Sequence, residues 1–174
     1  MKILVACEQS GRVRDAFKAL GHDAWSCDIL PTDSPGQHLQ CDITTVLNNG
    51  WDLMVAHPPC TYMANSGVSW LHKDPTRWGK LDEAAVLFKL LMDAPIQRIC
   101  IENPIMHKYA KERIGWAKQS QIIQPWMFGH MEKPRQPAYG SRIFHRSNPP
   151  TSLKAVNNAS GRWLQAQHAP KTAA

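Results

Sequence analysis

Short apolar runs alternate with segments of helical periodicity through the first 130 residues, and this order leaves few architectures open to the chain. Val13, Ala16, Phe17 and Leu20 repeat at the spacing of one helix face, and a longer helical pattern covers residues 77–94. The runs of strand length are KILVA (2–6), DAWSCD (23–28), LQCDI (39–43), WDLMVA (51–56) and RICIE (98–102). This alternation predicts βαβ units in an α/β fold, with a mostly parallel sheet and helices on both faces.

The charge of the chain is distributed unevenly. Residues 1–132 hold 13 basic and all 14 acidic residues, whereas residues 133–174 hold seven basic residues, no acidic residue and five of the 13 prolines. A chain of 174 residues is long enough for one core. We therefore expect one domain over 1–132 and a basic, proline-rich, irregular tail over 133–174. Because the positive charge belongs to the tail, it gives no reason to place a DNA-binding face on the domain.

The sequence also restricts the environment of the protein. No apolar run approaches the roughly 20 residues that span a bilayer, and the N-terminal MKILVACEQSG becomes polar too early for a signal peptide. Five scattered cysteines without a Cys-x-x-Cys pair argue against a disulfide framework or a zinc site. We expect a cytoplasmic protein with reduced thiols, no membrane partner and no metal. No pattern indicates its oligomeric state.

Candidate cofactor contacts follow the first three predicted strands. A polar turn, CEQSGR (7–12), comes after the first. Gly11 is its one glycine, so the turn lacks the dinucleotide-binding fingerprint and is interpreted on its own as a plain strand-to-helix turn. Asp28 ends the second strand, where a carboxylate can accept the ribose hydroxyls of an adenosine-containing cofactor. Asp42 follows the third and could contact an adenine amino group. Each aspartate alone is as well explained as a loop-capping residue.

A stiff loop, HPPCTYMANSG (57–67), follows the strand WDLMVA. Two prolines fix two φ angles and disfavour a helix before them, so Cys60 is a presented thiol candidate. A thiolate in such a loop is a competent nucleophile, whereas most free cysteines are small buried hydrophobes. Glu102 closes the strand RICIE and precedes Asn103-Pro104, where a new helix is predicted to start. Its carboxyl is placed for acid chemistry or, equally, as a charge near a helix N-terminus.

Taken in order, these motifs resemble the cytosine carbon-5 DNA methyltransferases, in particular short members that are frequent in phages and prophages. The first turn is similar to their cofactor motif, HPPCTYMANSG to their Pro-Cys motif, and IENPI (101–105) to their Glu-Asn-Val motif, with proline replacing valine. The resemblance covers about residues 1–132. It implies a Rossmann-like, class I S-adenosylmethionine-dependent methyltransferase fold that acts on DNA. It assigns cofactor contacts to Glu8, Ser10, Gly11, Asp28, Asp42 and Pro58, and catalytic roles to Cys60, Glu102 and Asn103.

The mechanism that the resemblance implies agrees with the chemistry of these residues. Carbon 5 of cytosine is too weak a nucleophile to attack a sulfonium methyl group, so the Cys60 thiolate adds to carbon 6 first. A protonated Glu102 would bond ring nitrogen 3 and stabilise the developing charge, and Asn103 would orient the loop. The target base must leave the duplex to reach such a site. The motif of the amino-methyltransferases, Asp or Asn, then Pro-Pro, then an aromatic residue, differs from this chain at His57 and Cys60.

Two features depart from the resemblance. No target-recognition region is visible, and the segment from about Lys133 differs from the antiparallel strands that relatives carry there. Back-translation with a one-base shift yields a family-like segment, so a frameshifted or truncated tail is one hypothesis, and it predicts a sheet without its edge strands. The alternatives to a DNA methyltransferase are a non-catalytic or remnant S-adenosylmethionine-binding protein and an enzyme that modifies a free pyrimidine nucleotide.

Overall fold

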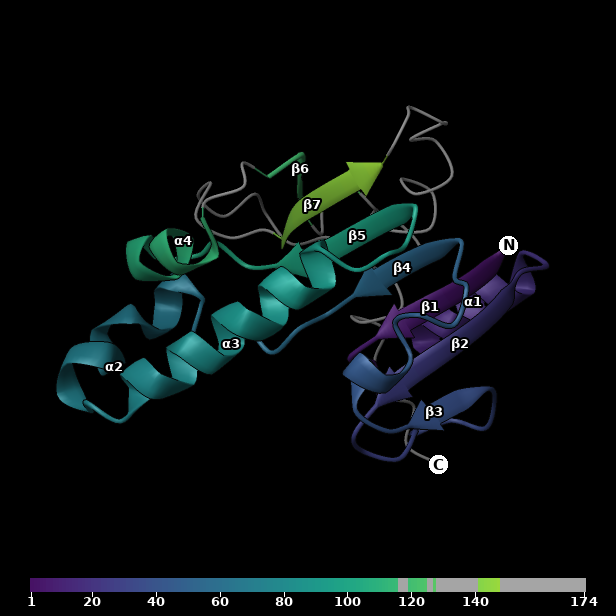
Figure 1. Ribbon diagram of the computed structural model, residues 1–174, viewed down its shortest axis with the longest axis horizontal. Helices are drawn as coiled ribbons and strands as arrows, with labels where there is room; N and C mark the ends of the chain where they lie inside the picture. Colours follow the sequence, from purple (N-terminus) through teal and green to yellow (C-terminus); the bar gives the residue numbers. More distant parts are fainter. Residues whose placement is uncertain (116–118, 125–126, 128–140, 148–174) are drawn as a thin grey trace.

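One mixed sheet runs through the described part of the chain, which comprises residues 1–115, 119–124, 127 and 141–147 of a computed structural model (Figure 1). Its strands are β1 (Lys2–Ala6), β2 (Asp23–Asp28), β3 (His38–Gln40), β4 (Leu53–Ala56), β5 (Arg98–Asn103), β6 (Gln121–Ile123) and β7 (Ser141–Ser147). The helices are α1 (Arg12–Ala19), α2 (Val68–Lys73), α3 (Arg77–Met92) and α4 (Lys108–Ile114). Two short 3-10 turns cover Ile43–Thr45 and Asn65–Gly67.

The strand order is β3-β2-β1-β4-β5-β7-β6. The first five strands are parallel, and β7 is antiparallel to both of its neighbours. The chain moves outward in one direction from β1 to β3 and in the other from β4 to β5, so the order reverses between β1 and β4. In open α/β sheets, ligands bind outside the carboxyl ends of the strands at such a reversal. The predicted α/β fold with a mostly parallel sheet is confirmed.

Both faces of the sheet are covered, because the central strands are apolar on both sides. On β1, Leu4 and Ala6 belong to the core that α3 covers, while Ile3 and Val5 belong to the core that contains α1 residue Phe17. Figure 1 shows α1 and α3 on opposite sides of the sheet. Each of these four β1 residues is 0% exposed. This continuous burial explains why the strand reads as an uninterrupted apolar run.

The start of α4 differs from the sequence-based expectation. A helix was expected at Asn103-Pro104, but Asn103 is the last residue of β5 and α4 begins at Lys108. The intervening backbone is held extended, because Ile105 accepts a hydrogen bond from the Asn65 amide at 2.7 Å and Met106 forms a β-bridge with Ala64. The sequence around Pro104 contains no sign of these contacts, which come from a loop about 40 residues earlier.

The prediction of an irregular segment from Lys133 onward is wrong for residues 141–147. They form β7, which pairs with β5 over six residues and with β6 over three. Phe144 anchors the strand, since its ring lies edge-on to that of Phe88 with the centroids 5.3 Å apart. The sheet therefore has the strands that the frameshift hypothesis said it would lack. Residues 133–140 and 148–174 of the predicted tail lie outside the described residues.

Candidate active site

The carboxyl ends of four parallel strands meet at one edge of the sheet. Ala6 at the end of β1 lies opposite both Cys27 of β2 and Ala56 of β4, and Ala56 lies opposite Ile101 of β5. The residues that follow these positions are Cys7, Asp28, His57 and Glu102. Asp28 and Glu102, two of the candidates from the sequence, thus lie with Cys7 and His57 at the edge where a sheet of this topology binds ligands.

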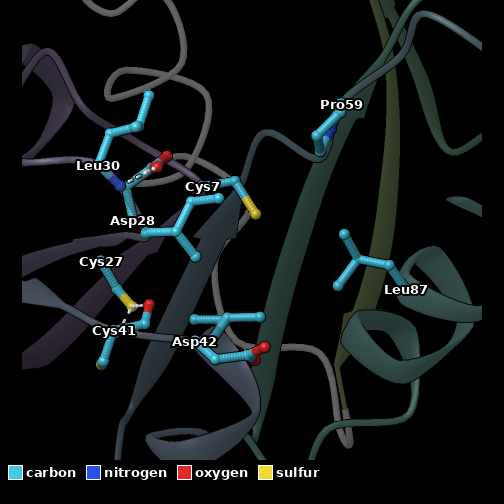
Figure 2. A pocket seen from close by; sticks show the side chains of 10 residues that line it. Cys7, Cys27, Asp28, Leu30, Cys41, Asp42, Pro59 and Leu87 are labelled. Atoms are coloured by element: carbon cyan, nitrogen blue, oxygen red, sulfur yellow. Dashed lines mark hydrogen bonds between the residues drawn. The ribbon is translucent and has the colours of Figure 1, made fainter.

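A cavity of about 360 Å³ lies at this edge, above β1, β2 and β3. Figure 2 shows Asp28 and Asp42 on one side of it, with Pro59 and Leu87 across from them. The remaining lining residues are Cys7, Cys27, Ile29, Leu30, Cys41 and Ile43. A mostly apolar wall with two carboxylates is the lining expected for a small-molecule site with a few orienting polar groups.

Each of the two carboxylates closes its own turn through a single oxygen. Asp28 Oδ1 accepts from the Leu30 amide at 3.0 Å, and Asp42 Oδ1 accepts from the amide and hydroxyl of Thr44 at 2.8 and 2.7 Å. The bonds from the Thr44 amide and hydroxyl lower the pKa of Asp42. Within the described residues, Oδ2 of neither aspartate has a hydrogen-bond partner. Each residue is therefore a turn cap with one oxygen left for a ligand.

The first turn serves the local structure. Glu8 is buried and accepts hydrogen bonds from the amides of Val13 at 2.7 Å and Arg14 at 3.3 Å, so it caps the N-terminus of α1. Ser10 donates to the same carboxylate, and Gly11 takes a φ of 71° that favours glycine. Glu8, Ser10 and Gly11 do not line the cavity in Figure 2. Their assignment as cofactor contacts stays a prediction.

Arg14 is a residue whose importance the sequence did not reveal. Its side chain is 0% exposed, and its guanidinium donates to the Ser26 and Ser34 hydroxyls and to the Pro35 carbonyl. It also pairs with Asp15 at 2.8 Å. Arg14 therefore fixes the loop after β2, which carries one wall of the cavity, against the start of α1.

Cys7 lies between the two carboxylates at the end of β1. Among the described residues it is the one non-glycine with a positive φ, at 57°. Burial raises the pKa of its thiol to about 12, with further contributions from the charges of Asp28 and Asp42. The thiolate of Cys7 is thus disfavoured, and Cys7 lines the wall of the cavity together with both aspartates.

Cys60 lies on the other side of the proline pair from this cavity. Pro59 lines the first cavity, Pro58 is buried and does not line it, and Cys60 lines a second cavity of about 480 Å³. The carbonyl of Cys60 accepts hydrogen bonds from the amides of Met63 and Ala64 at 2.9 and 2.8 Å. These bonds fold the chain into a tight turn directly after the cysteine, and Cys60 lies beside the second cavity.

Glu102 lies near the carboxyl end of β5 and close enough to Cys60 for its charge to act on the thiol. Burial raises the pKa of the Cys60 thiol, and the nearby charge of Glu102 raises it further. The Glu102 carboxylate also lies 3.9 Å from Nδ1 of His57, and both side chains are largely buried. The predicted acid therefore lies beside the imidazole of His57, three residues before Cys60, and the roles of Cys60 and Glu102 stay predictions.

The loop after Cys60 is tied to the segment after Glu102. The His107 amide donates to the Met63 carbonyl at 3.1 Å, and His107 Nε2 lies 2.8 Å from the Tyr62 carbonyl. Nδ1 of the same ring accepts from the Ala110 amide at 3.0 Å and caps α4. His107 thus carries its proton on Nε2 and holds the loop after Cys60. The sequence had suggested this role for Asn103.

Asn103 is 0% exposed, and neither Oδ1 nor Nδ2 has a hydrogen-bond partner in the described part of the chain. A buried amide without partners is uncommon in folded proteins. It lies directly after Glu102 at the carboxyl end of β5. Its catalytic role stays a prediction.

Two further observations concern the protein as a whole. All five cysteines are free, with the thiols of Cys27 and Cys41 3.9 Å apart. Within the described ranges, no cluster of three or more His, Cys, Asp or Glu side chains is arranged to hold a metal ion. The same ranges contain no helix with the length and apolar character that crossing a membrane requires.

Comparison with solved structures finds several similar chains. The chain resembles a solved structure from E. coli, described as a candidate DNA modification methyltransferase encoded within a prophage, with a TM-score of 0.39 and 14% sequence identity. The match covers 65% of this chain and 37% of that one, so this chain spans little more than a third of it. No family model matches the sequence, and no curated protein matches it. A function for this chain has to be argued from its own residues.

Proposed function

We propose that this protein methylates carbon 5 of cytosine in DNA, using S-adenosylmethionine and a covalent bond between Cys60 and the base. The observation that carries the proposal is the 3.9 Å contact between Glu102 and His57, which begins the loop that carries Cys60 three residues later. The charge of Glu102 also acts on the Cys60 thiol. A thiol and a carboxyl at one point of a parallel sheet are the two groups that addition to a pyrimidine ring requires.

The residues around the first cavity fit the methyl donor. The apolar wall would contact the adenine ring, and the unpartnered oxygens of Asp28 and Asp42 would accept hydrogen bonds from the ribose and the adenine amino group. The volume lies within the range of small-molecule sites. S-adenosylmethionine bound there would supply an electrophilic methyl group. The order β3-β2-β1-β4-β5, with its reversal beside this cavity, supports the same assignment.

Cys60 and Glu102 would act as a coupled pair. A negative charge on Glu102 disfavours the Cys60 thiolate, so the reactive form of the pair has the proton on the carboxyl. In that form the Sγ of Cys60 bonds to carbon 6 while the Glu102 proton is donated to ring nitrogen 3. The ring then holds a carbon 4–carbon 5 double bond, an enamine whose carbon 5 is nucleophilic. After carbon 5 has been methylated and has lost its proton to a base, nitrogen 3 returns its proton to the Glu102 carboxylate, the Cys60 thiolate leaves and the carbon 5–carbon 6 double bond is restored.

Trapping tests the proposal on the full chain. DNA containing 5-fluorocytosine retains the covalent bond, because fluorine at carbon 5 blocks the proton loss that precedes release of the cysteine. With radiolabelled S-adenosylmethionine, we expect a labelled protein–DNA adduct that is absent from Cys60→Ser. Cofactor binding without an adduct would favour the non-catalytic alternative. Transfer to free deoxycytidine monophosphate but not to DNA would favour the nucleotide-modifying alternative.

A further inference from the structure

The second cavity has a different character from the first. It lies on the Cys60 side of the loop, has a volume of about 480 Å³, and includes Thr61, Ser66, Trp70 and Arg77 in its lining. Neighbouring residues of one loop, Pro59 and Cys60, thus face separate cavities. If the donor occupies the first cavity, the acceptor has to reach Cys60 through the second.

Trp70 offers a flat apolar surface at this cavity. It lies on α2 and is 53% exposed, which is unusual for so large a side chain. The ammonium group of Lys73 lies 4.8 Å from the centre of its ring. An exposed indole with a cation beside it is suited to stacking with a nucleic-acid base, because every base has a flat π-face and carries a phosphate nearby.

Arg77 offers a fixed positive charge in the same cavity. Its guanidinium lies 4.6 Å from the centre of the Tyr62 ring, and its Nε is buried without a hydrogen-bond partner within the described residues. Asp74 lies near enough for the charge of Arg77 to help lower its pKa, but the described residues show no ion pair between the two. Asp74 Oδ1 accepts hydrogen bonds from the Thr76 hydroxyl and amide. A guanidinium that lies over an aromatic ring and has no carboxylate partner among the described residues suits a phosphate group.

We propose that the second cavity binds the DNA strand that carries the target cytosine, with Arg77 on a backbone phosphate and Trp70 stacked on a base next to the target. This inference rests on the proposed function and specifies how its substrate is held. Phosphate and stacking contacts carry no sequence information. Strand binding at this cavity therefore shows little sequence preference.

The test is fluorescence anisotropy of a labelled single-stranded oligonucleotide with the full-length protein, in the Cys60→Ser background so that no chemistry occurs. We expect Trp70→Ala and Arg77→Gln each to weaken binding about tenfold. Arg77→Gln should also reduce the slope of log affinity against log salt by about 0.7, the contribution of one phosphate contact. The matched control is Lys80→Gln. Lys80 lies one turn after Arg77 on α3, and its ammonium group is already paired with Glu83 at 3.1 Å.

The outcomes separate this inference from the proposed function. Selective loss in Trp70→Ala and Arg77→Gln, with Lys80→Gln and Trp70→Phe close to the parent, supports the inference even where trapping yields no adduct. Unchanged affinity in both cavity variants, or an equal loss in Lys80→Gln, overturns it. Displacement of the oligonucleotide by an equal concentration of deoxycytidine monophosphate also overturns it, because the cavity then takes a free nucleotide. Thermal unfolding checks each variant, and Arg77→Lys replaces Arg77→Gln if the latter unfolds.

Discussion

The imidazole of His107 joins two segments that are far apart in the sequence: its Nε2 lies 2.8 Å from the carbonyl oxygen of Tyr62, 45 residues earlier. Through this bond, the loop that follows Cys60 and the helix that follows Glu102 share one anchor. Because the same ring also caps α4 through Nδ1, a change at His107 acts on both segments together.

Replacing His107 should destabilise the protein. His107→Ala removes a helix cap and a buried hydrogen bond, each worth about 1 kcal/mol, so we expect a loss of roughly 2 kcal/mol in the free energy of unfolding. His107→Asn retains a capping acceptor and should lose less. Urea unfolding at pH 7 measures both variants. Equal stability of the alanine variant and the parent would contradict the role that we give to this ring.

The same residue predicts a pH dependence. Burial lowers the pKa of His107, so the unfolded state binds its proton at a higher pH than the native state does. Its contribution to stability is complete above the unfolded pKa of about 6.5 and is lost as the pH falls below that value. We expect the free energy of unfolding to fall less between pH 7 and 5 in His107→Asn than in the parent. Identical pH profiles would exclude His107 as a source of the acid sensitivity.

Glu102→Gln should make Cys60 more reactive toward a small electrophile while it abolishes methyl transfer. The negative charge of Glu102 is one of the two causes that raise the pKa of Cys60, so its removal favours the thiolate at a given pH. The rate of alkylation by iodoacetamide, read at Cys60 by peptide mass spectrometry, should rise and its pH midpoint should fall. Glu112→Gln, which changes an exposed acid on α4, is the control and should alter neither.

Loss of the Arg14 guanidinium should lower the free energy of unfolding. Arg14→Met leaves the polar groups of the loop after β2 without their donor, and we expect the free energy of unfolding to fall by about 3 kcal/mol. Lys18→Met, an exposed position on the same helix, should stay within about 0.5 kcal/mol of the parent. Comparable stability of the two variants in urea would show that Arg14 does not hold this loop in solution.

Phe144→Ala tests the strand that the sequence did not predict. Removal of a ring that is 2% exposed and packed on Phe88 should cost roughly 3 to 5 kcal/mol of unfolding free energy. Ile122→Ala on β6, where the side chain is 41% exposed, should cost far less. If residues 141–147 were irregular in solution, the two substitutions would have similarly small effects.

The parts of the fold that the sequence predicted are those governed by local pattern. β1 is a continuous apolar run after Lys2, and β2 is a run of strand length that ends in Asp28. Their observed bounds, Lys2–Ala6 and Asp23–Asp28, match the expected ones. The helix expected to end at Gly21 does so, because Gly21 takes a φ of 80° directly after the last turn of α1. For these elements, a few consecutive residues are enough to indicate a buried parallel strand or a helix that ends at a glycine.

The parts that the sequence did not reveal depend on distant partners. Arg14 reads as an ordinary solvent-facing charge until the loop after β2 folds over it. His107 gains its role from the Tyr62 carbonyl, and β7 gains its place from pairing with β5. Strand formation is decided largely by such pairing and less by intrinsic preference, so a short basic segment rich in polar residues gave no sign of it.

The position of β1 has a practical consequence for handling the protein. Met1 is 46% exposed at the amino edge of the central strand, and both cavities lie beyond the carboxyl edge, about five residues or 16 Å further along. Figure 1 shows the N-terminus on the far side of the sheet from α2. An affinity tag or a biotin attached there would leave the cavities facing the solvent when the protein is coupled to a sensor surface.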